Sequence, residues 1–110
     1  MKVEHQKHSV IIKDTQGNLE SFVEKLSHEY KSFEKENIIL DLTQYKELTL
    51  KQLNLFLALS KTHKASKKSF VLVANDIDFN LISDKLSIVP SQLEAHDLIE
   101  LDEIERDLGF

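Results

Sequence analysis

The side chains that most often carry chemistry in proteins are present in this sequence, but their spacing matches no known site. One of the five histidines, His28, is followed by a glutamate, yet a serine stands where the zinc-binding pattern H-E-x-x-H needs its second histidine. His5 and His8 lie three residues apart in expected strands, a spacing that directs their side chains to opposite faces. We therefore expect the histidines, including His63 and His96, to be surface or partly packed residues, and we expect no bound metal.

Other binding motifs in the sequence are incomplete. Asp76, Asp78 and Asn80 repeat the first half of a calcium-binding loop, but leucine and serine then replace the glycine and glutamate that complete it. Loops that bind phosphate need clustered glycines, and Gly17 and Gly109 are the only two in the chain. No serine or threonine is placed beside a base in the manner of a catalytic nucleophile. The sequence therefore predicts no catalytic residue and no cofactor.

The length and composition bound the class of protein. A chain of 110 residues fits one domain, which we place at 1–110. There is no cysteine, which excludes disulfides and cysteine-bound zinc. The N-terminal segment lacks the apolar stretch of a signal peptide, and no apolar run approaches the roughly 20 residues that span a bilayer. We expect a cytoplasmic protein without a membrane partner.

Charge is unevenly distributed along the chain. The net charge is −5, and the segment 94–107 contains seven acidic residues but only one basic residue. Such acidity disfavours binding to nucleic acid. The densest basic cluster consists of Lys61, His63, Lys64, Lys67 and Lys68. We expect this cluster to form a solvated turn after a helix, because cations stabilise the C-terminus of a helix.

The order of apolar patterns predicts an α/β fold. Short β-branched and apolar runs predict strands at 3–5, 9–13, 38–42, 69–74 and 86–89, and apolar residues at helical spacing predict helices at 19–35, from Thr49 onward, near Leu81 and Ile82, and from Ser91 onward. Thr49 with Gln52, and Ser91 with Glu94, form capping boxes, and we expect the last helix to kink or restart near Asp102. This order predicts a single domain with a mixed, largely parallel sheet of four to five strands, covered by three to four helices.

The helix that begins at Thr49 has more leucine than one buried stripe requires. Its apolar residues are Leu50, Leu53, Leu55, Phe56, Leu57 and Leu59. Two interpretations remain open. Either the helix is buried between the sheet and a second neighbour, or some of its apolar side chains form an exposed patch, which is typical of contact surfaces.

The segment 38–59 resembles a known family. The pattern I-I-L-D-L-T, then six residues, then a leucine-rich helix and the strand that begins at Ser69 resembles the STAS domain. This family covers cytoplasmic domains of sulfate transporters and bacterial anti-sigma factor antagonists. The resemblance implies a regulatory module that binds proteins near the start of the second helix. The antagonists carry an Asp-Ser-Ser/Thr-Gly signature there, in which a hydroxyl is phosphorylated, but the corresponding residues here are Thr49, Leu50, Lys51 and Gln52, so the phosphorylation site is not carried over.

The end of the chain is similar to a narrower group. The segment 90–110 resembles that of small bacterial STAS-like proteins sometimes labelled ribonuclease Z. That nuclease needs an H-x-H-x-D-H metal cluster, which this sequence lacks. The label therefore implies at most an association with the nuclease.

Three functional hypotheses follow. The leading one is a non-catalytic protein-binding module resembling anti-sigma factor antagonists, whose partner contacts Thr43, Gln44, Tyr45, Lys46, Glu47, Leu48, Thr49, Leu50 and Lys51. If the surface is elsewhere, the acidic terminal helix with Glu100, Glu103 and Arg106 is the next candidate. The alternative is an accessory protein in RNA metabolism that binds RNA or a nuclease through the basic cluster at 61–68. The third is an unrecognised enzyme or nucleotide binder, which would need a deep pocket with convergent polar groups.

Overall fold

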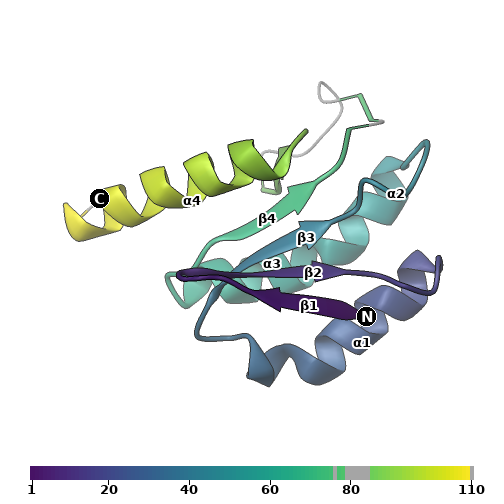
Figure 1. Ribbon diagram of the computed structural model, residues 1–110, viewed down its shortest axis with the longest axis horizontal. Helices are drawn as coiled ribbons and strands as arrows, with labels where there is room; N and C mark the ends of the chain where they lie inside the picture. Colours follow the sequence, from purple (N-terminus) through teal and green to yellow (C-terminus); the bar gives the residue numbers. More distant parts are fainter. Residues whose placement is uncertain (76, 79–84, 110) are drawn as a thin grey trace.

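The computed structural model describes residues 1–75, 77–78 and 85–109. Five strands form one mixed sheet in the order β1-β2-β3-β4-β5 (Figure 1). They are β1 (Lys2–His5), β2 (Ser9–Lys13), β3 (Asn37–Asp41), β4 (Phe70–Val73) and β5 (Ser87–Val89). β1 runs antiparallel to β2, whereas each later strand runs parallel to its neighbour. The predicted α/β class and the mixed, largely parallel sheet are confirmed.

Helices cover both faces of this sheet, because the pleat sends alternate apolar side chains to opposite sides. On one face lies the larger core, in which Phe22 of the first helix packs with four sheet residues: Val10, Ile12, Leu40 and Leu72. This core lies against α1 (Leu19–Glu29), α2 (Leu50–Leu53) and α3 (Leu57–Ala65). On the other face, a smaller core joins Ile11, Ile39, Val71 and Val73 to α4 (Gln92–Asp107) through Ala95 and Ile99. Figure 1 shows α4 on one side of the sheet and α1 and α3 on the other.

Two of the predicted helices are shorter or more divided than the sequence indicated. The first is α-helical only to Glu29 and ends in a 3₁₀ turn, η1 (Tyr30–Ser32), although Phe33 beyond it is buried as the apolar spacing required. The second consists of α2 and α3 joined by a 3₁₀ turn, η2 (Asn54–Phe56). Its capping box at Thr49 is confirmed. The short helix expected near Leu81 and Ile82 lies outside the described residues.

The predicted break in the last helix near Asp102 is wrong, because α4 runs without interruption from Gln92 to Asp107. The Asp102 carboxylate does not cap a new helix. It accepts a hydrogen bond of 2.7 Å from the hydroxyl of Ser69, at the start of β4. The capping box predicted at Ser91 is only half formed. The Ser91 hydroxyl accepts from the backbone N–H of Glu94 at 3.2 Å, but the Glu94 carboxylate accepts from that same hydroxyl, at 3.0 Å.

No helix in the part of the chain that the structure describes is both long enough and apolar enough to cross a membrane.

Candidate functional site

The predicted partner-binding residues lie at one edge of the sheet. Strands β2 to β5 are parallel, so their carboxyl ends meet at the same edge, and the loops that lead to α1, α2 and α4 start there. In Figure 1, the loops after β2 and β3 and the starts of α1 and α2 lie together at this edge. Ligands of open α/β sheets commonly bind at such an edge, and the segment 43–51 is part of it.

Asp14, just after β2, holds two of these loops together. It is almost completely buried, and its carboxylate accepts hydrogen bonds from the backbone N–H groups of Gln16 and Gly17 at 3.0 and 2.9 Å. The hydroxyl of Tyr45 donates a further short hydrogen bond to it from the loop after β3. Burial alone would raise the pKa of Asp14, but these hydrogen bonds outweigh burial and leave the pKa below its ordinary value. The carboxylate is therefore ionised and engaged by its own neighbourhood.

Asp41, at the end of β3, likewise holds together the loop after β3 and the start of α4. Its carboxylate accepts hydrogen bonds from the backbone N–H and the hydroxyl of Thr43, at 3.0 and 2.6 Å. The side-chain amide of Gln92 donates to it at 3.2 Å and so ties the start of α4 to the sheet. Burial opposes ionisation, but the hydrogen bonds and the charge of Lys13 lower the pKa of Asp41 overall. Neither Asp14 nor Asp41 has the raised pKa that a general acid requires.

The structure divides the nine predicted residues into two groups. Leu48 is buried in the larger core, and Thr43 and Tyr45 are half-buried with their hydroxyls bonded to Asp41 and Asp14. These three hold the loop in place. The other six face solvent, and we name them the edge surface: Gln44, Lys46, Glu47, Thr49, Leu50 and Lys51.

The conformation of the edge surface is tightly determined. The backbone N–H of Thr49 donates to the Gln52 side chain at 2.9 Å, and the backbone N–H of Gln52 donates to the Thr49 hydroxyl at 3.2 Å. Glu47 adopts the left-handed conformation, with φ of 52°, which non-glycine residues rarely occupy. Such conformations persist only where the surrounding contacts enforce them, and they are concentrated at functional loops.

Large exposed apolar side chains occur in two places among the described residues. Leu50, 41% exposed, belongs to the edge surface, and Leu55 on η2 is exposed to a similar degree. The second place is α4 and the residue that follows it: Leu93, Leu101 and Ile104 on the helix, and Leu108 just after its end, are 72%, 52%, 53% and 67% exposed. The helical spacing of the last three was visible in the sequence. Their exposure was not, because it depends on which face of α4 meets the sheet.

The other two residues proposed with Glu100 on the acidic terminal helix point toward the sheet. Glu103 accepts a hydrogen bond of 2.7 Å from the side-chain amide of Asn37, and Arg106 donates to the hydroxyl of Ser69 at 3.3 Å. Glu100 is exposed. Of that group, Glu100 alone faces solvent.

The expectation that His63 is a surface or partly packed residue is wrong. It is fully buried, and its Nε2 atom lies 2.7 Å from the carbonyl oxygen of Glu36 while its Nδ1 atom lies 2.7 Å from the Tyr30 hydroxyl. A carbonyl only accepts, so Nε2 carries the proton and Nδ1 accepts from Tyr30. Burial lowers the pKa of His63 and favours this neutral form. Phe56, Ser60 and His63 share one buried helical face, a spacing that could have revealed its burial.

The basic cluster is accordingly smaller than its sequence suggests. Without His63, it consists of lysines around the end of α3, where Lys64 donates to the hydroxyl of Ser87 at 2.9 Å. The backbone N–H groups of Lys67 and Lys68 donate to the carbonyls of Lys64 and His63, which closes the helix. Lys67 occupies the left-handed position of this motif, with φ of 64°.

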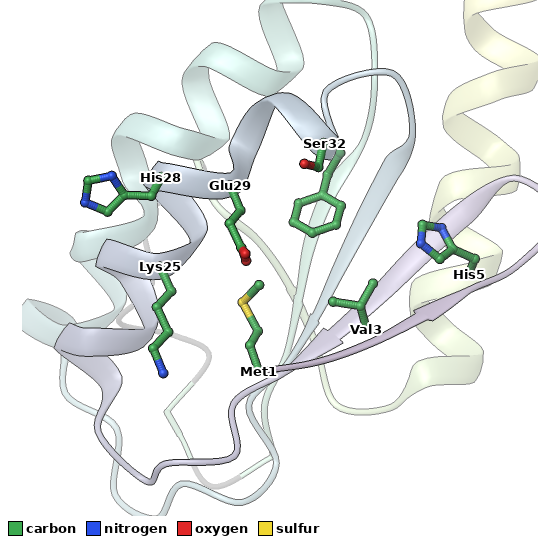
Figure 2. A pocket seen from close by; sticks show the side chains of 8 residues that line it. Met1, Val3, His5, Lys25, His28, Glu29 and Ser32 are labelled. Carbon is green, nitrogen blue, oxygen red and sulfur yellow. The ribbon is translucent and has the colours of Figure 1, made fainter.

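A pocket of about 610 Å³ lies between β1 and the end of α1. Figure 2 shows that its polar side chains do not converge on one point: the His28 ring points outward, the His5 ring lies on the far side, and the Glu29 carboxylate points toward Met1. A catalytic constellation needs groups aimed at a shared reacting atom, which these residues do not provide.

In the described part of the chain, no three histidine, aspartate or glutamate side chains are grouped closely enough to hold a metal ion. Asp76 and Asn80, of the incomplete calcium motif, lie outside that part. Comparison with protein-family models and with curated proteins found no match for this chain.

Proposed function

We propose that this chain is a non-catalytic protein-binding module of the STAS-like type, and that its partner contacts the edge surface. The observation that carries the proposal is the exposure of Leu50 on a capped first helical turn, beside a loop fixed by two buried carboxylates. A surface held in one conformation before binding loses little conformational entropy when the partner docks.

The composition of the edge surface supports a protein as the partner. Leu50 provides an exposed apolar side chain, and Lys46, Glu47 and Lys51 add exposed charges of both signs in the same segment. An apolar centre with a polar rim is the usual anatomy of a transient protein interface. A nucleic acid would instead favour a surface of uniform positive charge.

The proposed module works without the phosphorylation that regulates anti-sigma factor antagonists. Leu50 and Lys51 replace the hydroxyl residues of the antagonist signature, and the hydroxyl of Thr49 already accepts the capping hydrogen bond from Gln52. Partner binding is therefore expected to be the same before and after phosphatase treatment.

The experiment is a quantitative capture of proteins from an extract of the native cells. The double variant Leu50→Glu, Lys51→Glu is compared with the unmodified chain and with Lys31→Glu, Lys35→Glu, two exposed positions at and beyond η1. All three chains are first checked for folding by circular dichroism. We expect the edge variant to lose proteins that the other two retain. Capture of the same proteins by all three chains would place the binding surface elsewhere.

The RNA alternative makes a different prediction. If the lysines after α3 bound RNA, affinity would fall steeply with salt and would be lost in a Lys61→Glu, Lys67→Glu variant. For a protein-binding module, we expect no RNA binding by the unmodified chain at physiological salt.

A further inference from the structure

Helix α4 has a second apolar face that the sheet does not use. Ala95 and Ile99 pack against the sheet, as the smaller core shows. With 3.6 residues per turn, Leu93, Leu101, Ile104 and Leu108 fall within about 80° of arc on the opposite side of the helix. We name these four exposed residues the outer stripe.

Acidic side chains border the outer stripe. Five acidic residues of the helix are exposed: Glu94, Asp97, Glu100, Glu105 and Asp107. By the same helical geometry, four of them border the outer stripe, while Asp97 lies within it, between Leu93 and Leu101. The one arginine of the helix, Arg106, points the other way, toward Ser69. The solvent-facing side of α4 is therefore a leucine-rich strip that contains one acidic residue, Asp97, and has a strongly negative border.

The opposite side of the molecule carries a groove with the complementary character. It has a volume of about 810 Å³ and is lined, among the described residues, by Leu57, Ala58, Lys61, Lys64, Ala65 and Lys85. Leucine and alanine supply apolar surface to its lining, and three lysines supply positive charge. We name it the lysine groove.

We propose that the outer stripe of one copy of this chain docks into the lysine groove of a second copy. The apolar residues of the stripe then meet Leu57, Ala58 and Ala65, while Asp97 and the acidic border meet the lysines of the groove. Charge complementarity of this kind selects partners and fixes their orientation. The proposal is independent of the edge surface, since the two sets of residues do not overlap.

The two surfaces cannot meet within one molecule, because α4 and α3 cover opposite faces of the sheet (Figure 1). Each copy therefore presents one stripe and one groove, and association is head-to-tail. Direct pairing of two α4 helices is disfavoured, because it would bring five exposed acidic residues of each copy together.

The size of the surfaces predicts a weak interface. The outer stripe extends over about 22 Å, the length of 15 residues at 1.5 Å each. A single helical stripe of this length buries less surface than stable protein complexes bury. We therefore expect a dissociation constant of roughly 10 to 100 µM for the self-association. Association is then visible only at high protein concentration.

Analytical ultracentrifugation of the purified full chain, from about 1 to 500 µM, tests the proposal. Two variants each block one surface: Leu101→Glu, Ile104→Glu on the stripe and Lys61→Glu, Lys64→Glu in the groove. Lys31→Glu, Lys35→Glu carries the same charge change as the groove variant at another exposed place. Circular dichroism checks the fold, and Leu93→Glu, Leu108→Glu replaces the stripe variant if that variant unfolds.

We expect the unmodified chain and the Lys31→Glu, Lys35→Glu control to associate, and each blocked variant to remain monomeric by itself. An equimolar mixture of the two blocked variants has one intact stripe and one intact groove, so it forms a one-to-one dimer and nothing larger. Raising the salt from about 50 to 500 mM weakens the association at least about fivefold.

Three results would overturn the proposal: a monomer at every concentration, a mixture of blocked variants that stays monomeric, or association that strengthens with salt, as pairing of two acidic helices would. The Leu50→Glu, Lys51→Glu variant should associate like the unmodified chain. This variant is expected to lose partner capture but to keep self-association, so the proposed function and the self-association can fail separately.

Discussion

Asn37 is the residue whose replacement tests most sharply how α4 is attached to the sheet. It lies at the start of β3 and is almost completely buried. Its amide nitrogen donates to the carbonyl of His8 at 2.8 Å and to the carboxylate of Glu103 at 2.7 Å, and its amide oxygen accepts from the backbone N–H of Ser69 at 2.9 Å. The Asn37→Ala variant removes all three hydrogen bonds and leaves their partners in place.

The expected cost follows from the exposure of each partner. Ser69 is buried, so its N–H loses its partner where water is excluded, which costs about 1–3 kcal/mol. His8 is exposed and Glu103 is half-exposed, so water replaces most of what they lose, and together they add about 1 kcal/mol. We expect a total loss of about 2–4 kcal/mol, which corresponds to a fall in Tm of roughly 10–20 °C for a chain of this size.

Urea unfolding followed by circular dichroism measures this loss. Glu103→Gln is the matched control, because it keeps an oxygen that accepts from Asn37 while removing only a charge at a half-exposed site, and it should cost less than about 1 kcal/mol. Hydrogen exchange should also show faster exchange of the α4 amides in Asn37→Ala. An Asn37→Ala variant within about 0.5 kcal/mol of the unmodified chain would refute the reasoning.

Three further predictions concern stability. Because burial lowers the pKa of His63, its imidazole binds a proton more readily in the unfolded chain than in the folded chain, so its contribution to the free energy of unfolding is complete above about pH 6.5 and is lost as the pH falls below that value. The difference in unfolding free energy between pH 7.5 and pH 5.0, measured in urea, should be smaller in His63→Gln than in the unmodified chain, and equal differences would contradict this. Lys67→Gly should stabilise the chain by about 0.5–1 kcal/mol, because glycine occupies the left-handed position without strain; a loss of stability on thermal unfolding would count against it. Leu40→Ala should cost about 2–5 kcal/mol, since Leu40 is fully buried in the central strand, and a cost under about 1 kcal/mol in urea unfolding would disprove its role in the core.

The layered fold was predictable because its determinants are local. The unbroken apolar run in 38–42 is typical of a strand covered on both faces, and it forms the centre of the sheet. The capping residues Thr49 and Ser91 mark helix starts through contacts three residues away. Patterns of this kind depend on neighbours in the chain, so they can be read from one sequence.

The attachment of α4 and the hydrogen bonds of His63 to Tyr30 and Glu36 depend on contacts between distant segments. Ser69 meets Asn37 only because β3 and β4 pair in parallel register, and Asn37 meets Glu103 only because α4 crosses the sheet at that point. The same contacts explain why Asp102 does not restart the helix. No spacing rule in a single sequence specifies these pairings.

The position of the segment 43–51 in the fold was predictable, but the orientation of its side chains was not. The segment 43–51 does lie at the edge where the parallel strands end. Tyr45 turns inward because its hydroxyl donates a hydrogen bond to Asp14, and Leu48 turns inward because it packs in the larger core. Which loop residues face solvent depends on those two tertiary contacts.

Site-specific photo-crosslinking in the native cells shows directly whether a partner polypeptide contacts the edge surface. A photoreactive amino acid replaces Lys46 or Lys51 on the edge surface, and the control chain carries it at Lys31, which is also exposed but lies on η1. We expect positions 46 and 51 to crosslink to the same other polypeptide, with or without phosphatase treatment, and position 31 not to do so. Crosslinks from position 31 alone, or none from positions 46 and 51, would contradict a protein-binding role for this edge.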